Sequence, residues 1–395
     1  MILRPLLGIS IAVLLTACGL WGDMNDLRPV ILKDITITAY PEKTSYFLGE
    51  EHIDLTGLEI SAMYSNGSGK LIENYSYTGF DSATLGSKTI IIDYQGFTAE
   101  FTVTVAMTLF DVNNIVPYLA AMPDKGGAAD NPAYLSMQIE LGNMTDGRSG
   151  WRQILNAINE AKRYIDLDLS ACTMNGTTFD PDNTVVIGKA YIVSLVLPDE
   201  AKSLEALRHD SLFNRTFYHF NTLLSVSGAN IETINEGIFN YHTSLVSVSF
   251  PATVTIGDFA FYNCTNLSGV DIPAAAAIGD FSFYGCESLV NVSFPAVTKI
   301  APLAFWKCTN LASVNIPAAK LIDECAFRDT GDTSLTIKLG ATAPAIGENI
   351  FWECPPEKTV TVQIPFGAAG YDEEWQDQFS NVGGLHNINL VIITQ

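Results

Sequence analysis

The chain has 395 residues, 16% of them charged, and its 43 acidic residues outnumber its 21 basic ones. The resulting formal net charge of −22 repels phosphate backbones and anionic lipid headgroups, which excludes nucleic acid as an expected partner. The low charged fraction is typical of an ordered chain, and the length allows two or three domains.

Residues 1–17 have the pattern of an export signal, because a basic residue precedes an apolar run that is too short to span a membrane. The segment LTAC, which ends at Cys18, resembles the bacterial lipoprotein box. This resemblance implies cleavage before Cys18 and lipidation of its thiol, with residues 18–33 as lipidated cysteine and linker. The same resemblance implies an outer-membrane location, because Gly19 and not an aspartate follows the cysteine. We expect the protein to face the cell surface. A plain signal peptide with a chance cysteine is the alternative.

Residues 34–106 read as a small antiparallel β-sandwich, since runs such as ITIT and FTVTV alternate and are separated by turn sequences such as SNG. The module contains no cysteine, so no disulfide joins its sheets. The segments LGEEHIDLTGLEISAMYSNGS, TGFDSATLGSKT and DYQGFTAEFTVTV resemble bacterial Ig-like domains. The resemblance implies a spacer that lifts the following region off the membrane; direct binding by this module is the alternative.

Residues 107–210 combine a helix with irregular coils. Apolar residues recur at helical spacing over 151–161, which predicts an amphipathic helix. Residues 165–169 then alternate as a strand, and residues 192–197 match the strand columns of the repeats that follow. We expect an N-terminal cap and the first coils of a solenoid, because an open core end must be covered.

A 22-residue repeat fills residues 211–366, and each unit carries an Ile, a Phe five residues later, a Cys-like position and then Leu-x-x-Val-x-Ile/Phe-Pro. The Phe column is unbroken: Phe217, Phe239, Phe261, Phe283, Phe305, Phe327 and Phe351. The Ile column comprises Leu212, Ile234, Ile256, Ile278, Ile300, Ile322 and Ile346. The sixth unit carries an insertion, and its strand is expected at Leu335, Ile337 and Leu339. This period predicts a solenoid whose strands pair in parallel about 4.8 Å apart.

The pattern L-x-x-V-x-I-P, I-G-x-x-A-F and the following cysteine, as in Leu245 to Cys264, resembles the leucine-rich repeats of BspA-like bacterial surface proteins. The resemblance covers residues 212–365, and residues 367–395 are expected to form a C-terminal cap. It implies non-enzymatic attachment to host proteins or other bacteria and supplies no invariant ligand-binding residue. The expected fold class is mainly β: a small Ig-like β-sandwich followed by a leucine-rich-repeat solenoid with capping regions.

The sequence offers no catalytic or metal-binding constellation. Cys264, Cys286 and Cys308 recur at the repeat period, and His242 and Cys354 occupy the same column. A metal site would need converging ligands, whereas one sulfur per coil favours a buried small side chain, so we expect free, buried thiols. No spacing suggests a nucleophile site, a Walker loop or a dinucleotide fingerprint. We expect neither enzyme activity nor a cofactor.

Two strips of side chains are candidates for contact with a partner. The polar strip consists of outward-facing strand positions, whose small polar side chains would let a partner backbone or a glycan approach: Ser247, Ser249, Asp271, Asn291, Ser293, Ser313 and Asn315. The aromatic strip follows the Phe column and offers residue types favoured at interfaces: Tyr262, Tyr284, Trp306 and Trp352. The alternatives are ordinary solvent-facing polarity for the first strip and packing between coils for the second.

The sequence therefore predicts an exported, lipid-anchored cell-surface protein that acts in adhesion through its solenoid. Its expected partner is a protein, from the host matrix or a bacterial surface, or a glycan. We expect contact with a membrane only through the lipid anchor, and no contact with nucleic acid. The alternative is a periplasm-facing structural or envelope-organising lipoprotein.

Overall fold

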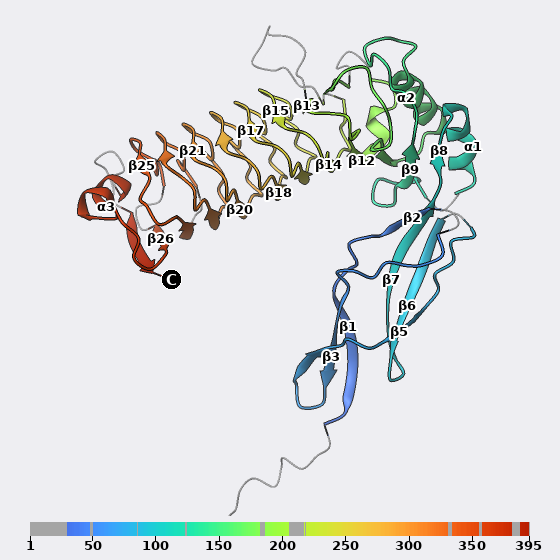
Figure 1. Cartoon of the computed structure of the whole chain (residues 1–395), viewed down its shortest axis with the longest axis horizontal. Helices are drawn as coiled ribbons and strands as arrows, with labels where there is room; N and C mark the ends of the chain where they lie inside the picture. Colours follow the sequence, from blue (N-terminus) through green and yellow to red (C-terminus); the bar gives the residue numbers. More distant parts are fainter. Residues whose placement is uncertain are drawn as a thin grey trace, which may run out of the picture. The chain divides into compact units, whose positions relative to one another are not determined.

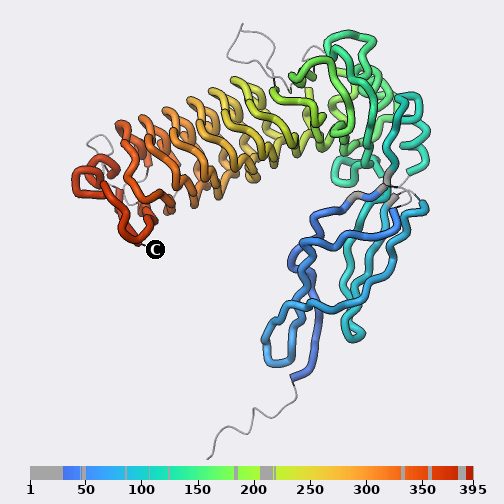
Figure 2. Tube along the Cα trace, viewed as in Figure 1, coloured from blue at the N-terminus to red at the C-terminus, as the bar shows by residue number. Residues whose placement is uncertain are grey.

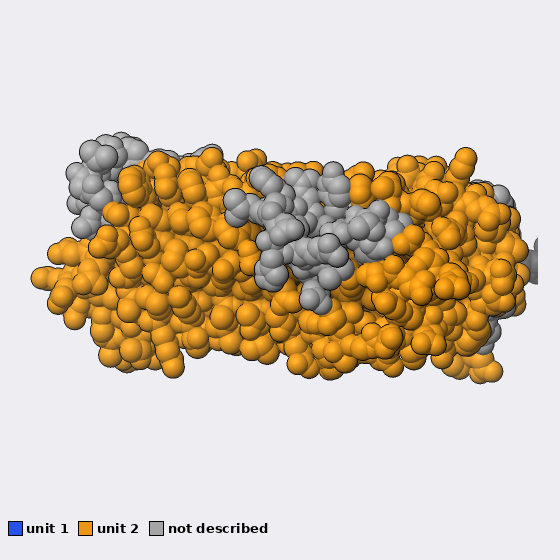
Figure 3. All heavy atoms as spheres, turned by 90° about the horizontal axis from the view of Figure 1, so that it is seen from above, with its two compact units in different colours: residues 1–44, 53–80, 89–102 blue, residues 45–52, 81–88, 103–395 orange. Residues whose placement is uncertain are grey.

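A computed structural model describes residues 30–394, apart from 48–49, 85, 123–124, 182–185, 205–216, 218, 331–333, 355–357 and 381–387. The expected export signal, the lipidation site Cys18 and the column residue Leu212 lie outside the described residues. The chain divides into two compact units, 1–44, 53–80 and 89–102 in the first and 45–52, 81–88 and 103–395 in the second. Figure 3 shows one face of the second unit, in orange. Among the described residues, no helix combines the length and apolar character that crossing a membrane would require.

The first unit is built from antiparallel strands, as expected for this part of the sequence. Strand β1 pairs with β3, β3 with β4, and β5 with β6. Apolar residues at alternate positions of these strands are buried, among them Ile35, Ile60, Ile90 and Ile92. The strands are β1 (Leu32–Ala39), β3 (Glu59–Tyr64), β4 (Gly69–Leu71), β5 (Ser76–Thr78) and parts of β6 (Gly86–Tyr94) and β7 (Phe97–Ala106).

The second unit is a solenoid of about nine turns, whose coils follow one another along a row (Figures 1 and 2). Its first residues form β2 (Ser45–Phe47), which pairs in parallel with the end of β7. One side of the solenoid, here called the strand wall, consists of two parallel sheets. The first sheet contains β8 (Thr108–Leu109), β9 (Ala133–Met137), β10 (Ile165–Asp168), β12 (Ile192–Val196), β14 (Ser225–Ser227), β16 (Ser247–Ser249) and β18 (Gly269–Asp271). The second contains β20 (Asn291–Ser293), β22 (Ser313–Asn315), β24 (Ser334–Lys338), β26 (Thr359–Ile364) and β27 (Asn389–Thr394).

Opposite the strand wall runs an unbroken eight-stranded parallel sheet, seen along the other edge of the coils in Figure 1. It contains β11 (Thr178–Phe179), β13 (Ser203–Leu204), β15 (Thr233–Ile234), β17 (Thr255–Ile256), β19 (Ala277–Ile278), β21 (Lys299–Ile300), β23 (Leu321–Ile322) and β25 (Ala345–Ile346). The described residues of the expected Ile column lie in these strands and are at most 1% exposed, except Ile346, which is half-buried. The prediction of this column is therefore confirmed.

The turns that follow this sheet carry the Phe column and are here called the turn wall. All seven column phenylalanines are at most 1% exposed, and successive rings stack with centroids 4.7–5.9 Å apart. Backbone hydrogen bonds also join each turn to the next; Phe261 N, for example, donates to Ser282 O over 2.7 Å.

In the strand wall, the strand predicted for the sixth repeat is β24, and Leu335, Ile337 and Leu339 are buried there.

Helices occupy both ends of the solenoid. Helix α2 (Gly150–Ala161) matches the predicted helix and buries its apolar face, and the Ser149 hydroxyl caps it by accepting from Arg152 N. At the other end, α3 (Glu373–Ser380) buries Trp375 and Phe379, and the Phe379 ring lies 5.2 Å from the last column ring, Phe351. The remaining helical elements are α1 (Ile115–Ala120), η2 (Val112–Asn114) and η3 (Lys189–Tyr191).

Candidate functional site

The polar strip lies on the outward side of the strand wall, across β16, β18, β20 and β22. The middle residue of each strand points inward, and Val248, Val292 and Val314 are at most 4% exposed. The residues flanking it face outward, because neighbouring side chains of a strand point to opposite faces. Figure 1 shows these strands along one edge of the coils. The flanking residues are the expected members: Ser247, Ser249, Asp271, Asn291, Ser293, Ser313 and Asn315.

Strand pairing places these side chains in two in-register columns. The first column aligns Ser247 with Gly269 and, further on, Asn291 with Ser313. The second aligns Ser249 with Asp271, and Ser293 with Asn315. Two hydrogen bonds connect members of the second column: Ser249 Oγ donates to Asp271 Oδ2 over 2.8 Å, and Asn315 Nδ2 donates to Ser293 Oγ over 2.8 Å.

The same columns continue beyond the residues that the repeat pattern indicated. Towards the N-terminus they reach Asp166 and Asp168 of β10, which pair in register with Ser194 and Val196. The Ser194 hydroxyl donates to Asp166 over 2.7 Å, and the Tyr134 hydroxyl donates to Asp168 over 2.5 Å. Burial raises the pKa of Asp166, against the opposite effect of the Ser194 hydrogen bond. Sequence reasoning missed these carboxylates as strip members, although the alternation in IDLDL already placed them outward.

Towards the C-terminus, the columns continue through β24 and β26. Thr336 and Lys338 follow Ser313 and Asn315 in register, and a threonine and a glutamine follow in β26. The strip thus has carboxylates at one end and an ammonium group at the other. Between them lie short hydroxyl and amide side chains and the carboxylate of Asp271, which leave the backbone of the strands close to the surface.

The aromatic strip is a stack of rings that cover one another. The rings of Tyr262 and Tyr284 are nearly parallel, at 9°, with centroids 4.4 Å apart. Trp306 meets Tyr284 edge-on, with centroids 4.8 Å apart. Burial and the neighbouring tyrosines Tyr284 and Tyr241 raise the pKa of Tyr262 to about 12. These side chains are half-buried, so the strip presents mainly ring edges to solvent.

Arg328 takes the place of an aromatic residue in this strip and extends the stack. Its guanidinium carbon lies 4.2 Å from the Trp306 ring centroid and 5.0 Å from that of Trp352. Glu353 holds the other side of the guanidinium, with Arg328 Nη2 at 2.6 Å from its carboxylate. Trp352 is the most exposed ring of the strip, at 42%. The stack therefore ties successive coils together and leaves little ring face for a ligand.

The repeat cysteines serve packing within the turn wall. Cys264, Cys286 and Cys308 are free and buried, as expected, and each thiol donates to the carbonyl of a phenylalanine in the preceding coil. For Cys286 the acceptor is Phe261 O at 3.2 Å. Burial raises the pKa of all three thiols, so the reactive thiolate is disfavoured. Within the described part of the chain, no group of three or more His, Cys, Asp or Glu side chains is placed to hold a metal ion.

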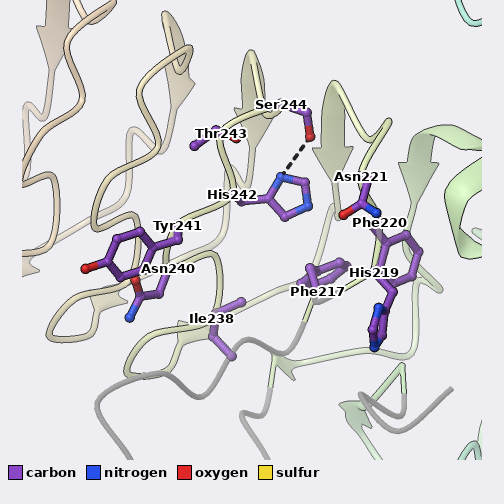
Figure 4. A pocket seen from close by; sticks show the side chains of 10 residues that line it. All are labelled: Phe217, His219, Phe220, Asn221, Ile238, Asn240, Tyr241, His242, Thr243 and Ser244. Carbon is purple, nitrogen blue, oxygen red and sulfur yellow. Dashed lines mark hydrogen bonds between the residues drawn. The ribbon is translucent and has the colours of Figure 1, made fainter. Parts of the chain in front are cut away.

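A cavity of about 150 Å³ lies where the cysteine column begins (Figure 4). In this coil His242 takes the place of the repeat cysteine. Its Nδ1 forms a hydrogen bond of 3.2 Å with the Ser244 hydroxyl. Rings and amides make up much of the wall, including Phe220, Asn240 and Tyr241. Among the described residues that line it there is no carboxylate.

Comparison with protein families identifies two segments of the chain. Residues 232–361 and 298–390 match the BspA type leucine rich repeat region. Residues 39–105 match the bacterial Ig-like domain of group 3. The matched repeat family is typically non-enzymatic and is consistent with protein binding.

Two curated proteins resemble short stretches of the chain. The pectate lyase L of Thermoclostridium stercorarium is 42% identical over 86 residues, which is 21% of this chain and 7% of that protein. The exo-beta-1,6-galactobiohydrolase of Bifidobacterium longum subsp. longum is 38% identical over 73 residues, 16% of this chain and 5% of that protein. The matches therefore span only a small fraction of these relatives' length.

Two solved structures show partial similarity. A leucine rich cell surface protein of Faecalibacterium prausnitzii has 22% identity and a TM-score of 0.31, covering 48% of this chain and 43% of that one. A leucine-rich repeat protein of Bacteroides ovatus has 16% identity and a TM-score of 0.34, covering 81% of this chain and 99% of that one.

Proposed function

Since the chain carries BspA-type leucine-rich repeats behind a bacterial Ig-like domain, we propose that it is an exported surface lipoprotein that binds a partner protein without catalysis. The binding surface in this proposal is the polar strip. The observation that carries it is the pair of in-register columns of short polar side chains across successive coils of the strand wall. Such side chains let a partner approach the backbone closely, and Asp271 and Asn291 are exposed at the centre of the strip.

The polar strip is preferred over the aromatic strip because of how the rings are used. The faces of Tyr262 and Tyr284 lie against each other, and Arg328 lies between Trp306 and Trp352. Aromatic side chains contribute most at interfaces when they enter a partner's pocket. Rings that already pack against the next coil would have to leave their stack to do so.

The same proposal includes a lipid anchor at Cys18, an outer-membrane location and a spacer formed by residues 34–106. The resemblance to the lipoprotein box supports the lipid anchor. The match to bacterial Ig-like domains supports the spacer. A glycan is the second partner class, because both curated relatives are named as enzymes of polysaccharides or oligosaccharides.

Location is tested by protease treatment of intact cells, followed by detection of residues 151–395. Cleavage on intact cells is the expected result, because an adhesion surface must be reachable from outside. Protection until the outer membrane is opened would contradict surface exposure and leave the envelope-organising alternative. Cys18→Ala should release the protein into a soluble fraction if the anchor is as proposed.

Binding is tested with the purified full chain against immobilised extracellular-matrix proteins. Asp271→Lys and Asn291→Arg place bulky charges at the centre of the strip and should weaken binding at least tenfold. Glu287→Lys makes the same charge change as Asp271→Lys at an exposed turn and is the matched control. Undiminished binding by both strip variants would remove the polar strip as the binding surface, whatever the partner.

A further inference from the structure

The last strand of the strand wall differs from the strands before it. In β20, β22, β24 and β26 the outward positions carry hydroxyl, amide or ammonium groups, and the two columns of the polar strip reach Thr361 and Gln363 of β26. In-register pairing continues these columns to Val391 and Ile393 of β27. These two side chains are 38% and 43% exposed. Both polar columns therefore end in exposed apolar residues.

Another apolar side chain is exposed at the same end of the solenoid. Phe366 follows β26 and is 90% exposed. Because Ile364 pairs with Thr394, Phe366 lies just past the C-terminal ends of β26 and β27. A side chain this exposed adds little to the core of its own chain. In other coils an alanine follows the strand and its proline: Ala252, Ala274, Ala296 and Ala318.

The outer edge of β27 carries a row of backbone donors and acceptors. Within the described residues, β27 is the last strand of its sheet and pairs only with β26. Asn389 N donates to Lys358 O over 2.8 Å, so the backbone groups of every second residue from Asn389 point to β26. Those of Leu390, Ile392 and Thr394 point away from it. Natural edge strands are commonly protected by charges or proline, and β27 has neither.

We propose that β27 pairs with β27 of a second copy of this chain, antiparallel about a two-fold axis. This inference goes beyond the proposed function, because it assigns a second surface to a different partner. The axis passes between the two Ile392 residues, which exchange both backbone hydrogen bonds, and Leu390 does the same with the partner's Thr394. This register uses every outward donor and acceptor of the edge, whereas a shift by two residues leaves some of them unused.

The same register brings the exposed apolar side chains together. Val391 lies opposite the partner's Ile393 on the outward face, at a pair without mutual hydrogen bonds, where side chains approach most closely. The axis repeats this pair, so the β-branched side chains of both copies form one cluster that is removed from water. On the inward face, the partly buried Leu390 and Ile392 gain neighbours in the same way.

Charge favours a second copy over a basic partner at this edge. The outward residues of β26 and β27 are all uncharged: Thr359, Thr361, Gln363, Asn389, Val391 and Ile393. A basic partner finds no carboxylate among them, whereas an identical strand matches their polarity. Helix α3, which lies against β27, carries the exposed carboxylates Glu373 and Glu374. Their repulsion between copies should make dimerisation stronger as salt is added.

Pairing at β27 joins the polar strips of two copies across one continuous sheet. A binding partner that presents the same epitope twice can then contact both strips. The second contact becomes intramolecular, which raises the overall affinity without any new interaction. The dimer therefore gives the strand wall two equivalent binding surfaces.

Self-association is tested by sedimentation velocity of the purified full chain. One pair of short strands buries little surface, so we expect a weak dimer, mainly monomeric at about 1 µM and mainly dimeric at about 100 µM. Added salt should shift the equilibrium towards the dimer. A monomer throughout this concentration range would overturn the proposal.

A lysine in the apolar cluster tests which surface is used. Ile393→Lys places two ammonium groups beside the axis and should weaken dimerisation at least tenfold. Gln363→Lys introduces the same charge in the same outward column, one strand away from the edge, and should leave dimerisation nearly unchanged. Ile393 is exposed, so a thermal melt should show that both variants remain folded. A dimer that survives Ile393→Lys would use another surface, and the proposal would be wrong.

Disulfide trapping tests the register in chains that carry Cys18→Ala. The remaining native cysteines are buried and do not compete. A mixture of Val391→Cys and Ile393→Cys chains should form a mixed disulfide on oxidation, because these two positions face each other across the axis. Neither variant should cross-link efficiently with itself. Cross-linking within one variant alone would place the axis elsewhere and overturn the pairing.

Discussion

The two walls of the solenoid are built from the same 22-residue unit, yet only the turn wall is continuous. In the turn wall, column rings stack from Phe217 to Phe351 and thiols donate across coils. In the strand wall, small outward side chains follow one another, and strand pairing is interrupted between β18 and β20. The turn wall therefore holds successive coils together where the strand pairing is interrupted, and the polar strip that we propose for binding lies on the strand wall.

The largest effect of a single substitution is expected from Phe283→Ala in the turn wall. The Phe283 ring is fully buried between Phe261 and Phe305, at centroid distances of 5.1 and 5.3 Å. Its loss should lower the free energy of unfolding by about 3–5 kcal/mol, measured by denaturant titration. Val290→Ala in the strand wall is the control and should change it by less than about 0.5 kcal/mol. Similar losses in both variants would contradict the division of roles.

The buried thiols should make stability fall at alkaline pH. Burial raises the pKa of Cys264, Cys286 and Cys308, so the folded chain keeps these protons when the unfolded chain, with thiol pKa values of about 8.5, releases them. The stabilisation that these thiols give to the folded chain is fully present below about pH 8.5. Above that pH the free energy of unfolding decreases by about 1.4 kcal/mol per pH unit for each thiol. Denaturation between pH 8 and 10 measures the slope.

The control for the alkaline slope is a variant with alanine at the three cysteine positions. This variant should start from a lower stability at pH 8, because each thiol hydrogen bond to a phenylalanine carbonyl is lost. Its stability should nevertheless fall less steeply with pH than that of the unmodified chain. An unchanged slope would assign the alkaline loss to other groups.

Ser282→Ala should stabilise the turn wall. Ser282 is fully buried, its hydroxyl has no hydrogen-bond partner among the described residues, and Ala260, Ala304 and Ala326 occupy the equivalent positions. Removing an unsatisfied hydroxyl should raise the free energy of unfolding by about 1–2 kcal/mol. The reverse change at a neighbouring coil, Ala260→Ser, should lower it, and a thermal melt of both variants tests the pair.

The smallest effect is expected in the aromatic strip. Arg328→Lys keeps the charge beside Glu353 but loses the planar group between Trp306 and Trp352. We expect a loss of about 0.5–1 kcal/mol in the free energy of unfolding. Lys299→Arg, at an exposed ion pair with Asp323, should leave stability unchanged. A loss of partner binding without a loss of stability would instead assign this strip to recognition.

The sequence predicted the interior of the solenoid because every coil repeats the same constraint. Phe283 and Ile278 sit where the 22-residue period places them, and the outward positions followed from the alternation around Val248 and Val292. The thiol column was predicted as buried from the mixture of residue types in it. The hydrogen bonds that those thiols make depend on backbone positions in the preceding coil, which the pattern does not specify.

The interruption of strand pairing between β18 and β20 could not be predicted, because the coil that contains Val270 has the same residue pattern as its neighbours. Whether two strands pair depends on how adjacent coils are rotated, and the sequence columns are insensitive to that rotation. The role of Arg328 was missed for a different reason: it replaces an aromatic residue, so a search for rings passes over it. The carboxylates Asp166 and Asp168 lie outside the regular period and needed the strand register to join the strip.

Because successive coils are joined by the same backbone hydrogen bonds, each coil adds the same length to the solenoid. A coil added or removed at the joint between β16 and β18 would meet equivalent backbone donors, acceptors and column rings on both sides. The length of the polar strip can therefore change in steps of about 4.8 Å without a change in the neighbouring coils. Each cap fits one end of the stack. The addition or removal of an internal coil would therefore leave the sequence of both caps unchanged.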